Sequence, residues 1–157
     1  MTAALAKKRV IMKIEDIENE FYSGDRQRIE MMARKILCGS RSHEFMKYLS
    51  GYATRFNELL QRTNPDDKDY LSLVYILAKH LTEIKNGKCA CTIVNMDMFN
   101  SPSRLHGILE IVEEEFNEEE YSHSVVSKCI SCGNIYDSKE VEWGFGRKVF
   151  WSLRKSS

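Results

Sequence analysis

The sequence predicts an α+β protein, with an N-terminal antiparallel helical bundle followed by a C-terminal antiparallel β-sheet that carries a zinc-knuckle-like cysteine cluster. Three observations predict this class. Apolar residues recur with helical spacing up to Gly87, they alternate along shorter segments after it, and two close cysteine pairs lie in the second part. The chain of 157 residues is expected to form one compact unit with a helical part, 1–87, and a β-rich zinc-binding part, 88–157.

Three helices are predicted before residue 62 from apolar residues spaced three or four apart. The first ends at the turn "SGD". The second begins at the capping residue Asp25 and stops at Gly39, and the third begins at the capping residue Ser42. Their apolar stripes are Ile14, Ile17 and Phe21; Ile29, Met32, Ala33 and Ile36; and, as one continuous stripe, Phe45, Leu49, Tyr52, Phe56 and Leu59.

The segment "NPDDKDY" (64–70) predicts the start of a fourth helix, because Asn64 can cap it, Pro65 suits its first turn and the aspartates complement its dipole. Asn86-Gly87 is a stop signal for this helix. Short connections between the helices predict antiparallel packing, with the apolar stripes as the core. The stripe of the fourth helix consists of Tyr70, Leu73, Val74, Leu77, Leu81 and Ile84.

After Gly87 the pattern is that of short strands. "CTIV" (91–94) is apolar and β-branched, "EYSHSVVSKC" (120–129) alternates, and "KEVEWGFGRKVFWSL" (139–153) predicts a hairpin that turns at "GFG". Residues 105–116 fit a helix or a strand. Gly107 and the acids at the would-be helix C-terminus favour a strand. Four aromatic residues of the hairpin are assigned to core or edge packing rather than to a binding platform: Trp143, Phe145, Phe150 and Trp151.

The two cysteine pairs predict a structural zinc site. Cys89 and Cys91 form C-x-C, and Cys129 and Cys132 form C-x-x-C-G, so four thiolates can complete the tetrahedron that zinc prefers. Four thiolates leave no open position for catalysis, and the metal would contribute to folding. The same spacing is compatible with iron. A redox pair, unrelated free thiols, or His123 as a replacement ligand are the alternatives, and Cys38 is assigned to the core instead.

Charge is divided unevenly along a chain whose net charge is zero. Residues 1–88 hold 16 Lys and Arg against 12 Asp and Glu, a surplus of four, and residues 89–157 hold 7 against 11, a deficit of four. The second part therefore suits a basic protein partner better than nucleic acid, unless its acids form only a solvated face. The candidate partner-binding residues are Glu110, Glu113, Glu114, Glu115, Glu118, Glu119 and Glu120.

Motifs of enzymes, membrane spans and secretion signals do not occur in the sequence. It contains no G-x-S-x-G, no phosphate-binding glycine loop and no H-E-x-x-H, so a non-enzyme is expected. No apolar run approaches the roughly 20 residues of a membrane-spanning helix. The N-terminal segment lacks the features of a signal peptide, which predicts a cytoplasmic protein with reduced thiols.

Residues 87–153 resemble a group of small bacterial immunity proteins found beside polymorphic toxins, in contact-dependent growth inhibition and related systems. The resemblance lies in "KCACTIV", the acidic strand, "SKCISCGNIYDSKEVEWG" and the aromatic end "VFWSL". It implies a cytoplasmic antidote that binds one cognate toxin domain tightly and blocks it. Many such toxins are basic nucleases, for which the acidic segment 110–120 would provide steering and a mimic of phosphate.

A second hypothesis is a zinc-ribbon protein that binds nucleic acid or serves as a transcription adaptor. The basic residues of the helical part would then contact phosphates, although those of "DRQRIEMMARK" (25–35) are scattered around a helix with an apolar face, which favours a solvated face instead. They are Lys7, Lys8, Arg9, Arg26, Arg28, Arg34 and Lys35.

Overall fold

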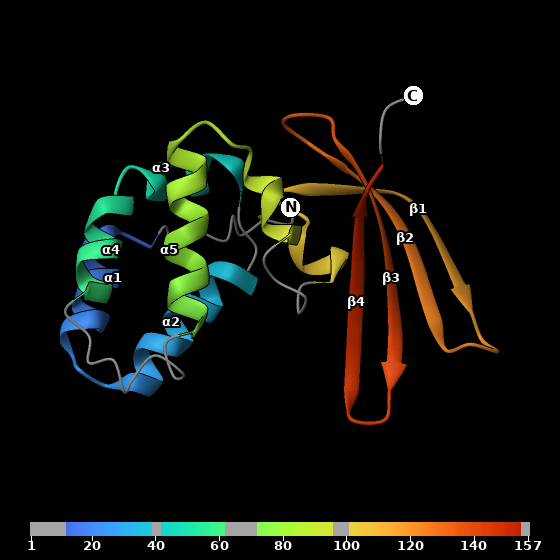
Figure 1. The fold of residues 1–157 in the computed structure, drawn as a ribbon, viewed down its shortest axis with the longest axis horizontal. Coiled ribbons are helices and arrows are strands. Elements are labelled where there is room, and N and C mark those ends of the chain that lie inside the picture. Colours follow the sequence, from blue (N-terminus) through green and yellow to red (C-terminus); the bar gives the residue numbers. More distant parts are fainter. Residues whose placement is uncertain (1–11, 39–41, 62–71, 96–100, 155–157) are drawn as a thin grey trace, which may run out of the picture.

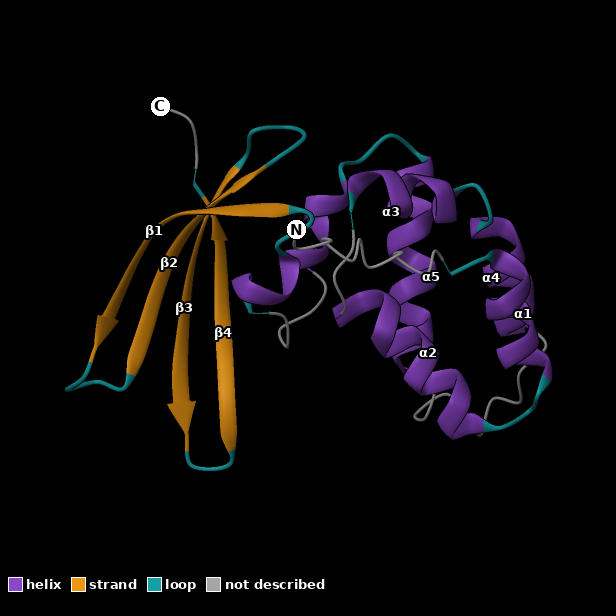
Figure 2. Ribbon diagram, turned by 180° about the vertical axis from the view of Figure 1, so that it is seen from behind, coloured by secondary structure: helices purple, strands orange, loops and turns teal. Residues whose placement is uncertain are grey.

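The computed structural model describes residues 12–38, 42–61, 72–95 and 101–154. The predicted α+β class is confirmed, because α-helices come first and a four-stranded antiparallel sheet follows. The helices and the sheet lie side by side, with the segment that follows the last helix between them (Figure 1). The view from behind shows the four strands splaying downward from one point, with β4 nearest the helices and β1 farthest from them (Figure 2).

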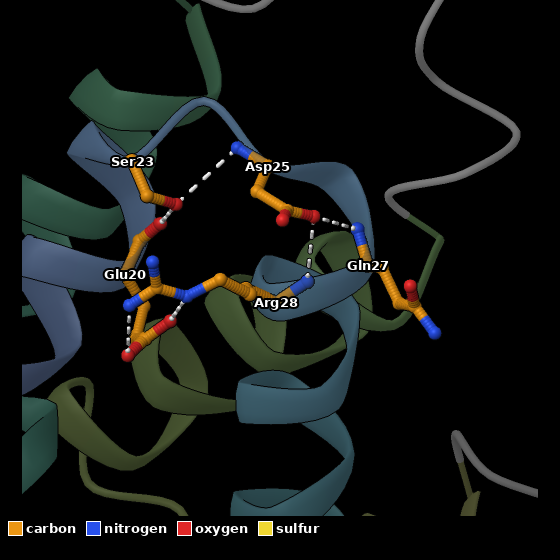
Figure 3. A network of polar contacts seen from close by, with 5 residues as sticks. All are labelled: Glu20, Ser23, Asp25, Gln27 and Arg28. Carbon is orange, nitrogen blue, oxygen red and sulfur yellow. Dashed lines mark hydrogen bonds and ion pairs between the residues drawn. The ribbon is translucent and has the colours of Figure 1, made fainter.

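The first two helices follow the sequence prediction. Helix α1 spans Ile14–Tyr22 and helix α2 spans Arg26–Cys38. Asp25 Oδ1 accepts hydrogen bonds from the backbone N–H groups of Gln27 and Arg28, at 3.0 and 3.2 Å, which satisfies two amides of the first turn of α2 (Figure 3). All the predicted apolar-face residues of the two helices are buried, namely Ile14, Ile17, Phe21, Ile29, Met32, Ala33 and Ile36.

The prediction of a single third helix is wrong, because the structure has two: α3, His43–Ser50, and α4, Ala53–Gln61. Ser42 caps α3 as predicted, with its side chain accepting from the backbone N–H of Phe45 at 3.1 Å. The break falls at Gly51, which has low helix propensity, and the Ser50 hydroxyl donates to the Lys47 carbonyl. The apolar stripe continues across the break and so gave no sign of it.

Helix α5, Ser72–Lys85, packs against α2, α3 and α4. Val74, Leu77 and Leu81 of its predicted stripe are buried, whereas the start signal 64–70 lies outside the described residues. Its predicted end at Gly87 is confirmed. The N–H of Gly87 bonds to the Ile84 carbonyl, the N–H of Lys88 bonds to the Glu83 carbonyl, and Gly87 takes the positive φ of 96° that this cap requires. In the described ranges, no helix has the length and apolar character needed to cross a bilayer.

The strand expected at "CTIV" is a 3-10 helix, Ala90–Asn95. The backbone N–H and the side-chain hydroxyl of Thr92 both donate to the carbonyl of Cys89, at 3.1 and 2.8 Å, so the chain curls instead of extending. A run of four apolar residues is too short for periodicity to separate the two conformations. Two apolar residues of this 3-10 helix, Ile93 and Val94, are buried in the common core.

The sheet is a simple meander of four antiparallel strands in the order β1-β2-β3-β4. The strand prediction for 105–116 is confirmed from Leu109 onward, whereas Pro102–Leu105 forms a 3-10 helix that precedes the strand. The predicted hairpin is also confirmed, with Trp143 paired with Gly146 across the turn. The strands are β1, Leu109–Asn117; β2, Ser122–Cys129; β3, Ile135–Trp143; and β4, Gly146–Leu153.

One face of the sheet joins the core of the helices. Leu109, Cys129 and Tyr136 share this face by register and belong to the same buried cluster as the helical residues. Trp151 lies on the same face and packs edge-on against Tyr136. The expectation of packing is wrong for Phe145, which is fully exposed at the hairpin turn, and for Phe150, half of whose surface is exposed.

Replacing Asp25 with Ala should lower the free energy of unfolding by about 1 kcal/mol, because two amides at the start of α2 lose their acceptor. Urea unfolding followed by circular dichroism measures the change. Asp25→Asn is the matched control, since asparagine keeps the capping oxygen. Equal losses in both variants would show that the carboxylate charge, and not the cap, supplies the stabilisation.

Candidate metal centre

Four cysteines meet where the helices join the sheet. Cys89 lies two residues after Gly87, the glycine cap of α5, and Cys91 lies in the first turn of the 3-10 helix. Cys129 is the last residue of β2, and Cys132 lies in the turn toward β3. The two cysteine pairs are far apart in the sequence, and the β1–β2 hairpin brings them together. The hairpin starts at Leu109 and ends at Cys129, and these two residues lie opposite each other in the register.

The distances between the four sulfurs suit one metal ion. The Sγ atoms of Cys89 and Cys129 are 3.6 Å apart, as are those of Cys91 and Cys132. All four lie within 4.8 Å of one another. A tetrahedron with Zn–S bonds of about 2.3 Å has sulfur–sulfur separations of about 3.8 Å. The four cysteines could therefore hold a metal ion after small movements of their side chains.

The turn after β2 presents its backbone to the sulfurs. The N–H of Cys132 points at Cys129 Sγ from 3.4 Å, and the N–H of Gly133 donates to the Cys129 carbonyl at 3.1 Å. Gly133 has φ of +79°, a conformation that other residues adopt only with strain. The glycine of the C-x-x-C-G motif therefore fixes the turn that brings Cys129 and Cys132 together.

The thiols differ in their tendency to ionise. Burial raises the pKa of Cys91, which is completely buried, and it also raises the pKa of Cys89. Burial opposes ionisation of Cys129 too, but hydrogen bonds from the backbone of Cys132 and Ser131 outweigh it and lower the pKa of that thiol. Cys129 is therefore the most readily ionised of these three thiols, and a metal ion that binds here has to displace a proton from Cys91.

Two further side chains contact the sulfurs. The Tyr136 hydroxyl lies 3.1 Å from Cys91 Sγ, and it can only donate once Cys91 is a thiolate. His43 Nε2 lies 3.5 Å from Cys129 Sγ and 3.1 Å from the Ile108 carbonyl, while His43 Nδ1 is 3.9 Å from Cys89 Sγ. Donors of this kind offset part of the charge of clustered thiolates.

His43 was missed in the sequence because it stands 46 residues before Cys89, at the first turn of a helix, and its spacing to the cysteines forms no metal-binding motif. Its neighbour Ser42 identified only the helix start. The histidine considered as a replacement ligand, His123, lies elsewhere on the sheet and contacts Glu114 at 3.1 Å. Cys38 ends α2, and its side chain lies outside the described residues.

The seven candidate partner-binding glutamates are all exposed. Four lie on β1, the strand at one end of the sheet order, and three lie in the turn that leads to β2. Two of the seven make polar contacts with neighbouring strands, Glu114 with His123 and Glu120 with Lys139, each at 3.1 Å. Glu110 lies at the cysteine end of the β1–β2 pair, next to Leu109 and opposite Lys128, and the other six glutamates lie farther along β1 and in the turn after it.

Comparisons of the chain with protein-family models, with curated proteins and with solved structures found no match in any of the three.

Protein purified without chelator should contain a single tightly bound metal ion per chain, and serine in place of Cys91 or Cys129 should remove it, because three thiolates bind more weakly than four. Elemental analysis measures the metal content. Removing the metal should lower the free energy of unfolding by several kcal/mol. Cys38→Ser is the control and should retain the metal. Full metal content in the Cys129→Ser variant would contradict the four-cysteine site.

Tyr136→Phe should weaken metal affinity by about tenfold while the chain stays folded, because the ring keeps its packing and only the hydrogen bond to Cys91 Sγ is lost. Competition with a chromophoric chelator measures the affinity. Tyr52→Phe, which alters a half-buried tyrosine of the helical part, is the control. An unchanged affinity in Tyr136→Phe would mean that this hydroxyl contributes nothing to the site.

Proposed function

We propose that this chain is an immunity protein, which binds and neutralises a cognate bacterial toxin, a basic nuclease, in the cytoplasm of the cell that makes it. The observation that carries the proposal is the row of exposed glutamates along β1 and its following turn. Such a surface attracts a cationic cleft and can occupy the positions of substrate phosphates. The protein acts by stoichiometric binding and not by catalysis.

In this proposal the four cysteines hold a structural zinc ion in a knuckle-like site. Zinc fits because tetrahedral thiolate ligation suits it, and because four ligands close the site to substrate. The helices form an antiparallel bundle around α5, and the metal connects this bundle to the sheet. The role of the metal is then to hold the acidic sheet in a fixed orientation for the toxin.

Two described contacts weigh against the zinc-ribbon alternative. Arg28 forms a two-bond ion pair with Glu20 (Figure 3), and Arg34 pairs with Glu30 at 3.4 Å. Both guanidinium groups are thus partly neutralised, Arg28 by a residue of the preceding helix α1 and Arg34 by a residue of its own helix α2. Lys7, Lys8 and Arg9 lie outside the described residues. Nucleic acid that copurifies with the chain and is lost in salt would favour this alternative.

Coexpression with the product of the neighbouring reading frame tests the proposal. The expected result is an equimolar complex in which the nuclease activity of the partner is lost. Absence of any such complex, together with no protection of cells against the toxin, would overturn the proposal.

Replacing Glu113, Glu114 and Glu115 together with glutamine should slow association with the toxin about tenfold at low salt, because steering by these charges is lost. Stopped-flow fluorescence measures the rate. The matched control removes three exposed glutamates from the helices, by glutamine at Glu15, Glu44 and Glu58. Equal slowing in both variants would show that net charge alone, and not the surface of β1, governs association.

A further inference from the structure

The strand β1 is an edge with one neighbour among the described residues. It pairs with β2 along its length, and every residue from Glu110 to Asn117 is exposed. In an antiparallel pair, alternate residues of an edge strand turn their N–H and C=O groups outward. Such groups can pair with an added strand.

The two faces of β1 differ in chemistry. Ile111 and Phe116 lie on the face shared with Cys129 and are 42% and 63% exposed, unusually large fractions for apolar residues of a strand. Glu110, Glu113 and Glu115 lie on the opposite face. Glu114 also lies on the face of Ile111 and Phe116, where it contacts His123 at 3.1 Å. Beside this edge, therefore, one side offers apolar groups and one carboxylate already engaged by a histidine, and the other offers three carboxylates that favour cations.

A hollow of about 730 Å³ lies next to the acidic side of β1. Register places the side chains of Glu113 and Glu115 in this hollow with Val126, Asp137 and Phe150 of the other strands. Two other charged residues line the hollow and are already paired, Asp137 with Arg154 at 2.6 Å and Lys139 with Glu120 at 3.1 Å. Glu113 and Glu115 therefore supply the negative charge on the β1 side of the hollow, within reach of side chains from a strand placed beside β1.

We propose that the toxin partner adds a strand to β1, and that this strand alternates basic residues, which face the hollow, with apolar residues, which cover Ile111 and Phe116. The inference rests on the proposed function and specifies how the partner is bound. Backbone hydrogen bonds supply the attachment, and the alternation supplies the specificity.

A second copy of the chain is a poorer occupant of this edge. Two β1 strands would bring their glutamates together, and like charges facing each other across strands are unfavourable. The opposite edge, β4, carries basic residues, but Arg147 is already 3.7 Å from Glu140 and Arg154 is paired with Asp137.

The test uses the full chain and synthetic peptides of about nine residues, the length of β1, that alternate lysine and valine. Two further peptides are methylated on backbone nitrogens. In one, the backbone nitrogen of every valine carries a methyl group, and in the other the backbone nitrogen of every lysine carries it. An added strand directs only one of these two sets of N–H groups toward β1. One methylated peptide should therefore bind at least about tenfold more weakly than the other, because its hydrogen bonds to β1 are lost.

Binding is followed by NMR titration and by hydrogen exchange of the β1 amides, which should become protected. Glu113→Gln with Glu115→Gln should weaken binding severalfold, whereas Glu118→Gln with Glu119→Gln, which removes the same charge in the turn, should not. Equal binding of both methylated peptides would overturn strand addition and leave an acidic docking surface. No binding of the unmethylated peptide, or a dimer of the free chain paired through β1, would also overturn it.

These outcomes are separate from those of the proposed function. A chain that binds the peptides asymmetrically but protects no cell from a toxin would contradict the immunity role and retain the strand-binding edge. A chain that neutralises its toxin but binds the two methylated peptides equally would retain the immunity role alone.

Discussion

The contact between four cysteine sulfurs joins the two parts of this molecule. Cys89 and Cys91 lie in the segment that follows α5, Cys129 ends β2 and Cys132 lies in the turn after it, so one pair is next to the helices and the other belongs to the sheet. The buried cluster around them is continuous, because Cys91, Cys129 and Tyr136 belong to the same core as the helix faces. The orientation of the sheet relative to the helices therefore depends on this junction. Burial disfavours the ionised form of a thiol such as Cys91, and a metal ion bound to the thiolates would offset that cost.

In the sheet next to this junction, almost the whole of strand β1 is exposed to solvent. One end of each strand of the β1–β2 pair lies in the core, at Leu109 and Cys129, while the rest of β1 is exposed on both faces. An isolated sheet of this kind would be weakly stabilised, since half-exposed strands bury little apolar surface. Anchoring one end through the cysteine cluster allows the remainder to present acidic and apolar side chains outward. The cysteine cluster and the exposed outer part of β1 thus lie at different ends of the same two strands.

Much of the fold followed from local signals. Asp25, Ser42 and Gly87 mark helix ends through specific hydrogen bonds, and each was identified from the sequence because its capping chemistry is local. The break at Gly51 and the 3-10 helix at Ala90–Asn95 were not identified. In the first case the apolar stripe continues across the break, and in the second a four-residue run carries no usable period. The burial expected for Phe145 failed because a residue at the tip of a hairpin has nothing to pack against, whatever its type.

The sequence by itself determined the identity of the four clustered cysteines, the class of the fold and the acidic character of the second part, since each depends on residue type and short-range spacing. Only the tertiary structure placed His43 and Tyr136 beside the sulfurs, because they come from elements distant in the chain. It also placed the glutamates on an edge strand and divided them between two faces, which depends on strand order and on the register shift after Ile111. Strand order and register arise from contacts between whole elements, and no local pattern of residues encodes them.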